Sequence, residues 1–203
     1  FAMLDTHARK FADPLFERIA RFLLRRNLTP THVTLAALIF GLCAGLLLYC
    51  NLPHAAVLVL WFSGLLDAVD GSMARQSGAS NLFGAVLDVT GDRVVELSFV
   101  WALALRHPDC AVPLLALVSC ILLSMTVFLT TGMLAQNHSS KSFYYPAGLM
   151  ERTEGFVMFS LMALVQTELA GITWVFAGLI LFTAIQRLLI AFRLQKQQSS
   201  NDI

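Results

Sequence analysis

Apolar stretches of membrane-spanning length dominate this sequence and restrict what it can fold into. A helix needs about 20 consecutive, mostly apolar residues to cross a bilayer. Five stretches meet this requirement directly, and a sixth meets it when it is counted through Arg75. The six stretches lie at residues 32–50, 55–75, 82–105, 111–134, 147–165 and 172–192. We therefore predict an all-α integral membrane protein with six transmembrane helices.

The composition excludes an ordinary soluble domain. Hydrophobic residues make up 57% of the chain and charged residues only 13%, whereas soluble domains contain about 45–50% and about 25% respectively. The four cysteines form no C-x-x-C pair and lie in or beside apolar runs, so we interpret them as small hydrophobic residues rather than zinc ligands. We expect the lipid bilayer as a partner and no nucleic acid.

Residues 13–26 have a different pattern. Asp13 and Pro14 are typical of a helix start, because a capping carboxylate precedes a proline at the first helical position. Apolar side chains then fall on one face and arginines on the other, which is typical of an amphipathic helix at the membrane interface. A helix packed on a soluble domain is the alternative. We divide the chain into an amphipathic juxtamembrane segment (1–30), a six-helix domain (31–194) and a polar tail (195–203).

The distribution of lysine and arginine predicts the orientation in the membrane. Cytoplasmic loops carry an excess of these residues. With a cytoplasmic N-terminus, the loops on the opposite side are residues 51–54, 106–110 and 166–171, and their only lysine or arginine is Arg106. We therefore expect both termini on the cytoplasmic side of a bacterial-type inner or plasma membrane.

Four aspartates, Asp67, Asp70, Asp88 and Asp92, fall within the predicted helices. An aspartate at the centre of a spanning helix costs about 2.5–3.5 kcal/mol, so such a residue usually faces a wet cavity and serves a function. The spacing within each pair places both carboxylates on one face of their helix. The connection between the two helices is short, so the two faces can meet. Both pairs lie in the cytoplasmic halves, which predicts a cytoplasmic site.

The clustering of these carboxylates predicts a metal site. Four carboxylates in one cavity of low dielectric cannot all stay ionised without cations. Oxygen ligands favour hard ions, Mg²⁺ first and then Mn²⁺ or Ca²⁺, and two divalent ions could also clamp a diphosphate. Gly71 and Gly84 would let a ligand approach the backbone, and the Arg75 guanidinium suits phosphate. A structural polar network is the alternative, although it does not require this spacing.

The segment from Asp67 to Asp92 reads D-A-V-D-G-S-M-A-R, then eight residues, then G-A-V-L-D-V-T-G-D. It resembles the signature of the CDP-alcohol phosphatidyltransferase family, DxxDGxxAR-(x8)-GxxxDxxxD, at every fixed position. The resemblance implies transfer of a phosphatidyl group from CDP-diacylglycerol to a polar alcohol, with release of CMP. It also implies magnesium dependence, with manganese as an alternative ion, and a homodimer.

The matching positions imply roles for individual residues. Asp67, Asp70 and Asp88 resemble metal ligands. Asp92 resembles the last carboxylate, which touches the metal and accepts the proton of the attacking hydroxyl. The positions that resemble nucleotide or donor contacts are Pro30, Thr31, His32, Val33, Thr34, Gly71, Ala74, Arg75, Asn81 and Gly84. The family often has Asn or Asp where this chain has Thr31.

The acceptor alcohol is the least constrained part of the prediction. Arg93 resembles the inositol-phosphate branch of the family more than the glycerol-phosphate branch. Inositol-phosphate enzymes also show R-x-E-R at the start of the fifth span, where this chain has Gly155 as the final residue. The segment from Lys141 onward resembles a further bacterial branch. The candidate acceptor contacts are Arg93, Lys141, Arg152 and Arg187. The alternative for each of these residues is a side chain that extends its charge to the membrane interface, or one that only determines the orientation of the helices in the membrane.

Three other functions follow from the same residues as alternatives. The chemistry could instead join a soluble CDP-alcohol to a lipid acceptor, and the product would then keep the donor's head group. A cation transporter would need polar groups that continue to the far side of the membrane, and the outer halves of the helices carry almost no charge. A catalytically inactive scaffold would not need the four aspartates intact.

Overall fold

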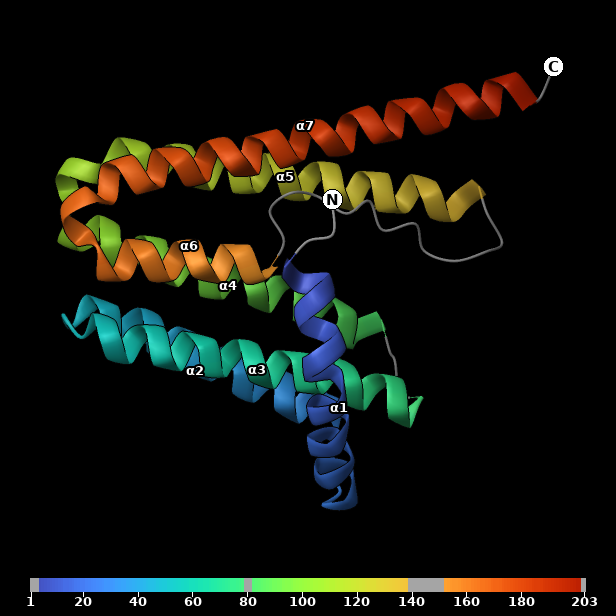
Figure 1. Ribbon diagram of the computed structural model, residues 1–203, viewed down its shortest axis with the longest axis horizontal. Helices are drawn as coiled ribbons and strands as arrows, with labels where there is room; N and C mark the ends of the chain where they lie inside the picture. Colours follow the sequence, from blue (N-terminus) through green and yellow to red (C-terminus); the bar gives the residue numbers. More distant parts are fainter. Residues whose placement is uncertain (1–3, 79–81, 139–151, 202–203) are drawn as a thin grey trace. The chain divides into compact units, whose positions relative to one another are not determined.

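A computed structural model of the chain describes residues 4–78, 82–138 and 152–201, with side chains over 13–78, 83–133 and 152–192. Every regular element in this part of the chain is helical (Figure 1). The elements are α1 (Leu4–Arg25), α2 (Pro30–Tyr49), α3 (Pro53–Ser77), α4 (Leu82–Arg106), η1 (Pro108–Cys110), α5 (Ala111–His138), α6 (Arg152–Leu164), η2 (Gln166–Glu168) and α7 (Leu169–Asn201). The predicted all-α class is confirmed.

Four helical stretches in the described part of the chain are long and apolar enough to cross a membrane. They are Pro30–Tyr49, Pro53–Ser77, Pro108–Met133 and Gln166–Phe192. The predicted third span corresponds to α4, which carries Asp88, Asp92, Arg93 and Glu96 and is too charged for this criterion. The predicted fifth span corresponds to α6, whose described part has only 13 residues. Six spans therefore remain a proposal.

Two helices extend beyond their predicted ends. α7 continues to Asn201, through most of the segment predicted as a polar tail, because its Gln, Lys and Arg residues are good helix formers even though they end the apolar stretch. α1 begins at Leu4 and contains Pro14 in its interior, so the helix start predicted at Asp13 is wrong. The residues before Asp13 include Ala, Arg and Lys, which favour helix, and α1 continues through Pro14 although a proline disfavours a helix interior.

The chain divides into two compact units. The first comprises Phe1–Pro108 with Phe159–Gln166, and the second comprises Asp109–Met158 with Thr167–Ile203. In the second unit α5 and α7 pack along each other (Figure 1).

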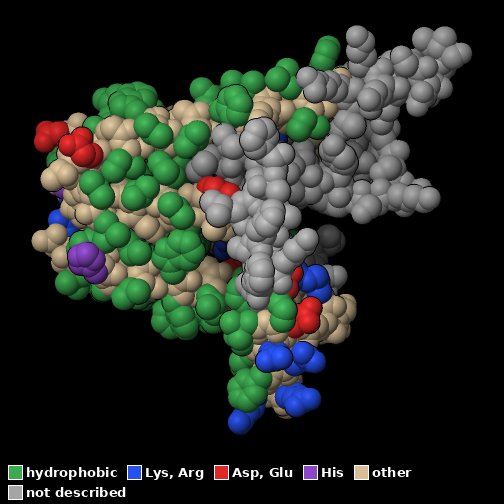
Figure 2. Space-filling view, viewed as in Figure 1, with side chains coloured by type: hydrophobic (Ala, Val, Ile, Leu, Met, Phe, Trp, Pro, Cys, Tyr) green, Lys and Arg blue, Asp and Glu red, His purple; other side chains and the backbone are tan. Residues whose placement is uncertain are grey.

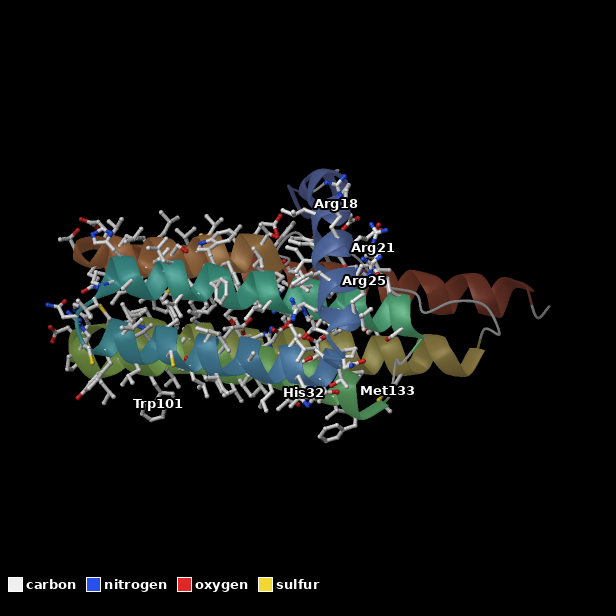
Figure 3. All side chains as sticks on the ribbon, turned by 90° about the horizontal axis from the view of Figure 1, so that it is seen from below. Arg18, Arg21, Arg25, His32, Trp101 and Met133 are labelled. Atoms are coloured by element: carbon white, nitrogen blue, oxygen red, sulfur yellow. The ribbon has the colours of Figure 1, made fainter. Side chains whose placement is uncertain are left out.

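In the first unit α2 packs against both α3 and α4. The buried residues of this unit's core are mainly Ala37, Ala44, Leu48, Leu60, Phe99 and Leu103. Trp101 on α4 is 64% exposed and points outward (Figure 3). The small side chains on α2 bring its neighbours close, as is typical of helix packing in membranes.

α1 packs an apolar face against α3. Ala20 is fully buried and clusters with Val69 and Met73, and the neighbouring apolar side chains of α1 are partly buried against them. Leu15 and Phe22 stay 55% and 57% exposed. Basic side chains gather along the same helix (Figure 2), and Arg18, Arg21 and Arg25 follow one another along one side of it (Figure 3). Part of its apolar surface is therefore used within the protein.

A group of polar side chains ties together the ends of α2 and α4. The Arg106 guanidinium donates hydrogen bonds to the carbonyl oxygen of Leu48, at 2.9 Å, and to the side-chain oxygen of Asn51. His107 lies next to Arg106, and its ring nitrogen is 3.0 Å from Oε1 of Gln166. The Leu48 carbonyl, in the last turn of α2, also accepts a hydrogen bond from the backbone N–H of Asn51 at 3.1 Å, so Arg106 adds a bond from α4 to an already capped helix end.

Candidate metal and nucleotide site

Three aspartates from two helices meet at one point of the first unit. Asp67 and Asp70 on α3 and Asp88 on α4 each offer a carboxylate oxygen, and these oxygens lie within 4.8 Å of one another. Asp70 is buried, at 6% exposed, and Asp67 and Asp88 are half-buried. The spacing i, i+3 on α3 turns both of its aspartates toward the same neighbour. The structure therefore brings together three of the four predicted ligands.

Asp92 lies one helical turn beyond Asp88 on α4 and is half-buried. Among the described residues it does not belong to the compact group of three. A turn of α-helix advances by about 5.4 Å, so Asp92 follows the group along the same face. Its role as the proton acceptor stays a prediction.

The chemistry of the three side chains fits a divalent cation. An all-carboxylate set of hard oxygen ligands suits Mg²⁺ or Mn²⁺ better than zinc or copper, which favour nitrogen and sulfur. Because like charges repel, each of these carboxylates makes ionisation of its neighbours less favourable, and a bound cation offsets that repulsion. Asp67, Asp70 and Asp88 are the residues that would hold the ion.

Arg75 lies in the last turn of α3, beside this cluster in the sequence. Its Nη2 donates a hydrogen bond to the hydroxyl of Ser72, at 2.9 Å. A Cβ atom at Gly71 would lie 3.5 Å from Nη1 of Arg75, so the guanidinium lies over the backbone of Gly71. Sequence reasoning missed Ser72, although its spacing of three residues from Arg75 on a helix is a signal for this contact.

The segment Pro30–Thr34 forms the start of α2. Thr29 caps the helix, because its hydroxyl accepts a hydrogen bond from the backbone N–H of His32 while Nδ1 of His32 accepts one from the N–H of Thr29, each at 3.4 Å. Thr34 donates to the carbonyl oxygen of Pro30 at 3.1 Å. Val33 is buried in the cluster between α1 and α3. Local structure therefore uses three of the five side chains predicted to contact the donor.

A cavity of about 420 Å³ opens beside this segment. Its lining residues are Leu24, Asn27, Leu28, Thr29, Pro30, Thr31 and Ser77. Pro30 and Thr31 are the predicted donor contacts that line it, and Ser77 belongs to the last turn of α3. The cavity therefore lies between the start of α2 and the end of the helix that carries Arg75.

The candidate acceptor contacts lie in several environments. Arg93 on α4 forms an ion pair with Glu96 at 2.6 Å. In the second unit, Arg152 lies over the ring of Phe156 at 5.7 Å. Arg187 in the same unit is buried, donates to Ser124 at 3.4 Å and lies 4.9 Å from the ring centroid of Phe128. The predicted contacts Asn81 and Lys141 lie outside the described residues. Glu96 lies one helical turn beyond Asp92, and its ion pair with Arg93 follows the i, i+3 spacing of the two residues on α4.

Residues 27–186 match the family model of the CDP-alcohol phosphatidyltransferases. The chain belongs to this family. The chain is 29% identical to a phosphatidylinositol phosphate synthase of Corynebacterium glutamicum, over 93% of this chain and 89% of the relative. A phosphatidylinositol phosphate synthase of Streptomyces avermitilis is 32% identical, over 95% and 84%. The inner membrane protein YnjF of Escherichia coli is 29% identical, over 91% and 93%.

Solved structures agree with this assignment. A crystal structure of Mycobacterium tuberculosis phosphatidylinositol phosphate synthase with CDP-DAG bound matches with a TM-score of 0.68 and 29% identity, covering 88% of this chain and 94% of that one. The same enzyme in complex with manganese and citrate matches with a TM-score of 0.66 and 28% identity, covering 87% and 88%. The protein is therefore a membrane enzyme of phospholipid biosynthesis that belongs to the transferases.

Proposed function

We propose that this enzyme transfers the phosphatidyl group of CDP-diacylglycerol to a polar alcohol and releases CMP, with Mg²⁺ held by Asp67, Asp70 and Asp88. The observation that carries the proposal is the convergence of three carboxylates from the two halves of one family signature. Two properties of the mycobacterial relative support it, since its structures contain CDP-DAG in one case and manganese in another.

The side chains around the cluster have complementary roles in this proposal. A divalent ion, when bound, polarises the diphosphate and neutralises the charge of the departing CMP. Arg75 directs its guanidinium donors at phosphate oxygens, a geometry in which arginine makes strong charge-assisted hydrogen bonds. Gly71 has no side chain, so the Arg75 guanidinium can lie over its backbone, and a nucleotide bound by Arg75 would approach α3 at this point.

Asp92 acts on the acceptor in this mechanism. Its carboxylate accepts the proton of the acceptor hydroxyl, and the oxygen of that hydroxyl forms a bond to the β-phosphorus of the donor. The bond between that phosphorus and the CMP oxygen breaks, so the phosphatidyl group moves and CMP leaves. An aspartate is a weak base at neutral pH, so its contribution depends on its position beside the reacting hydroxyl.

Inositol phosphate is the first acceptor to test, and glycerol phosphate is the second. Two of the relatives that match most of the chain are phosphatidylinositol phosphate synthases, and Arg93 follows Asp92 as the resemblance to that branch expects. Gly155 stands where the branch has an arginine, and no described atom lies within 4 Å of a Cβ built there. The sequence makes Arg152 and Arg187 further candidates for contact with the acceptor's phosphate.

We also propose that six helices cross the membrane, that α1 lies at its cytoplasmic surface, and that the enzyme forms a homodimer. The exposed Leu15 and Phe22 support an interfacial α1, because an apolar side chain at that depth can insert beside the lipid head groups. The arginines of α1 would then face anionic lipids, and both termini would lie in the cytoplasm.

One experiment tests the reaction and identifies the acceptor. The full chain, purified in detergent, receives CDP-diacylglycerol and Mg²⁺, and CMP release is measured with inositol 1-phosphate, glycerol 3-phosphate, inositol, serine or water alone, each with and without EDTA. We expect one alcohol to stimulate a release that EDTA abolishes. Stimulation that persists in EDTA would refute the metal site. Failure to bind any cytidine nucleotide would refute the proposed reaction.

A further inference from the structure

At Gly41 on α2, side chains from two other helices come close to the α2 backbone. A Cβ atom built at Gly41 would lie 2.2 Å from Cγ2 and 2.8 Å from Cγ1 of Val95, and 3.1 Å from the hydroxyl oxygen of Ser63. Val95 belongs to α4 and Ser63 to α3. One glycine therefore admits side chains from both helices that carry the carboxylate cluster.

The two contacting residues lie on the same helical faces as the aspartates. Ser63 is four residues before Asp67 on α3, and Val95 is seven residues after Asp88 on α4. Residues spaced by four or seven positions line one face of a helix. The faces that meet at the carboxylate cluster therefore also converge on α2 at Gly41.

Further contacts hold the three helices in this arrangement. The buried Ser63 hydroxyl donates a hydrogen bond to the carbonyl oxygen of Ala37, at 2.7 Å. One turn after Gly41, a Cβ atom at Gly45 would lie 2.5 Å from Oγ of Ser98 and 3.1 Å from its backbone carbonyl carbon. α2 is thus hydrogen-bonded to α3 and packed closely on α4 over successive turns.

We propose that Gly41 and Ser63 are positioning residues, which set the separation between the α3 and α4 aspartates and thereby the affinity of the metal site. This inference rests on the proposed metal-dependent function. Asp67 and Asp70 come from one helix and Asp88 from another, so the distances among their oxygens depend on how far apart α3 and α4 lie. Mg²⁺ requires near-ideal coordination geometry, which makes its site sensitive to that separation.

The substitution Gly41→Ala places a methyl group where the Val95 methyls lie. A valine side chain is restricted at χ1 because it branches at Cβ, so it cannot turn both methyls away, and α2 and α4 must separate. We expect the dissociation constant for Mn²⁺ to rise about tenfold and kcat to fall by about ten- to a hundredfold, the range seen when support of metal ligands is disturbed.

Three matched variants isolate the mechanism. The double variant Gly41→Ala/Val95→Ala removes both opposing methyls, and we expect it to recover Mn²⁺ affinity to within about threefold of the wild type. Val95→Ala alone controls for the lost valine. Gly178→Ala on α7 makes the same chemical change where no described atom lies within 4 Å of the new Cβ, and we expect wild-type affinity. Rescue by the second truncation would show that the contact with Val95 causes the loss, and an unfolding temperature near that of the wild type would show that the loss is not one of folding.

The measurement is Mn²⁺ binding to the full chain in detergent by electron paramagnetic resonance, alongside kcat for CMP release and the unfolding temperature. Ser63→Ala, which removes one hydroxyl, serves if Gly41→Ala does not fold; we expect a dissociation constant raised about threefold. Wild-type Mn²⁺ affinity in folded Gly41→Ala would overturn the proposal. If Gly41→Ala does not fold, wild-type affinity in Ser63→Ala would overturn it. A loss of Mn²⁺ affinity in Gly41→Ala that the added Val95→Ala does not reverse would also overturn it. A wild-type protein that binds no Mn²⁺ would instead show that the proposed metal site is wrong.

Discussion

Ser72 offers a way to test how Arg75 is held for phosphate binding. The Ser72 side chain is buried, at 3% exposed, and its hydroxyl accepts the hydrogen bond from Nη2 of Arg75 at 2.9 Å. Replacing Ser72 with alanine removes one oxygen and leaves the packing almost unchanged. Because Ser72 is buried, its loss can affect the nucleotide only through Arg75.

The size of this effect follows from the exposure of the arginine. A hydrogen bond to a charged group contributes about 1.5–3 kcal/mol when both partners are buried, and a typical one contributes about 0.5–1.5 kcal/mol. Arg75 is exposed, so water can replace part of the lost bond and the lower end applies. A loss of about 0.5–1 kcal/mol weakens binding about two- to fivefold.

The assay is a double-mutant cycle on the KM for CDP-diacylglycerol, with CMP release as the readout. We expect Ser72→Ala to raise KM about two- to fivefold and to leave kcat nearly unchanged. In an Arg75→Ala background the same substitution should change nothing further, because the arginine that transmits the effect is absent. An equal effect of Ser72→Ala in both backgrounds would refute the reasoning.

Two further predictions concern the carboxylates and α1. Asp92→Asn should nearly abolish CMP release while donor binding stays close to wild type, whereas Asp70→Asn should also weaken Mn²⁺ binding. Calorimetric titrations with CDP-diacylglycerol and Mn²⁺ distinguish the two variants. CMP release at the wild-type rate by Asp92→Asn would exclude Asp92 as the base. Met73→Ala should destabilise the protein by about 2–5 kcal/mol, because Met73 is fully buried between α1 and α3. Thermal unfolding in detergent measures this, and the exposed Met133→Ala is the control that should leave the melting temperature unchanged.

The sequence predicted the part of the site that depends on spacing along a helix. The interval between Asp67 and Asp70 places both carboxylates on one face of α3, that between Asp88 and Asp92 does the same on α4, and the short connection between the two helices lets the faces meet. Asp88 and Asp92, together with Arg93 and Glu96, explain why α4 is too charged to count as a membrane span in the described part of the chain. The functional residues thus weaken the signal that identifies the helix.

Residues that support the site could not be predicted in this way. Gly41 and Gly45 lie in an uninterrupted apolar run, where a glycine gives no indication of which helix approaches it. The hydrogen bond of Ser63 to α2 depends on how α2 packs, and the hydrogen bond of Ser72 depends on the rotamer of Arg75, so the sequence alone reveals neither. The predicted start of α1 was wrong for a local reason, because proline is favoured at the first position of a helix but can also lie inside one, as Pro14 does.

The shared support of α3 and α4 by α2 has a consequence for exchanging parts between family members. A chimera that receives only the segment Asp67–Asp92 from a relative would gain the carboxylates without the helix that spaces them. Val95 and Ser63, which contact Gly41, lie outside that segment, so the recipient's own residues at these positions would set the separation of the helices. A segment exchanged between family members must therefore begin before the signature, at the first turn of α2, to keep the spacing of the aspartates.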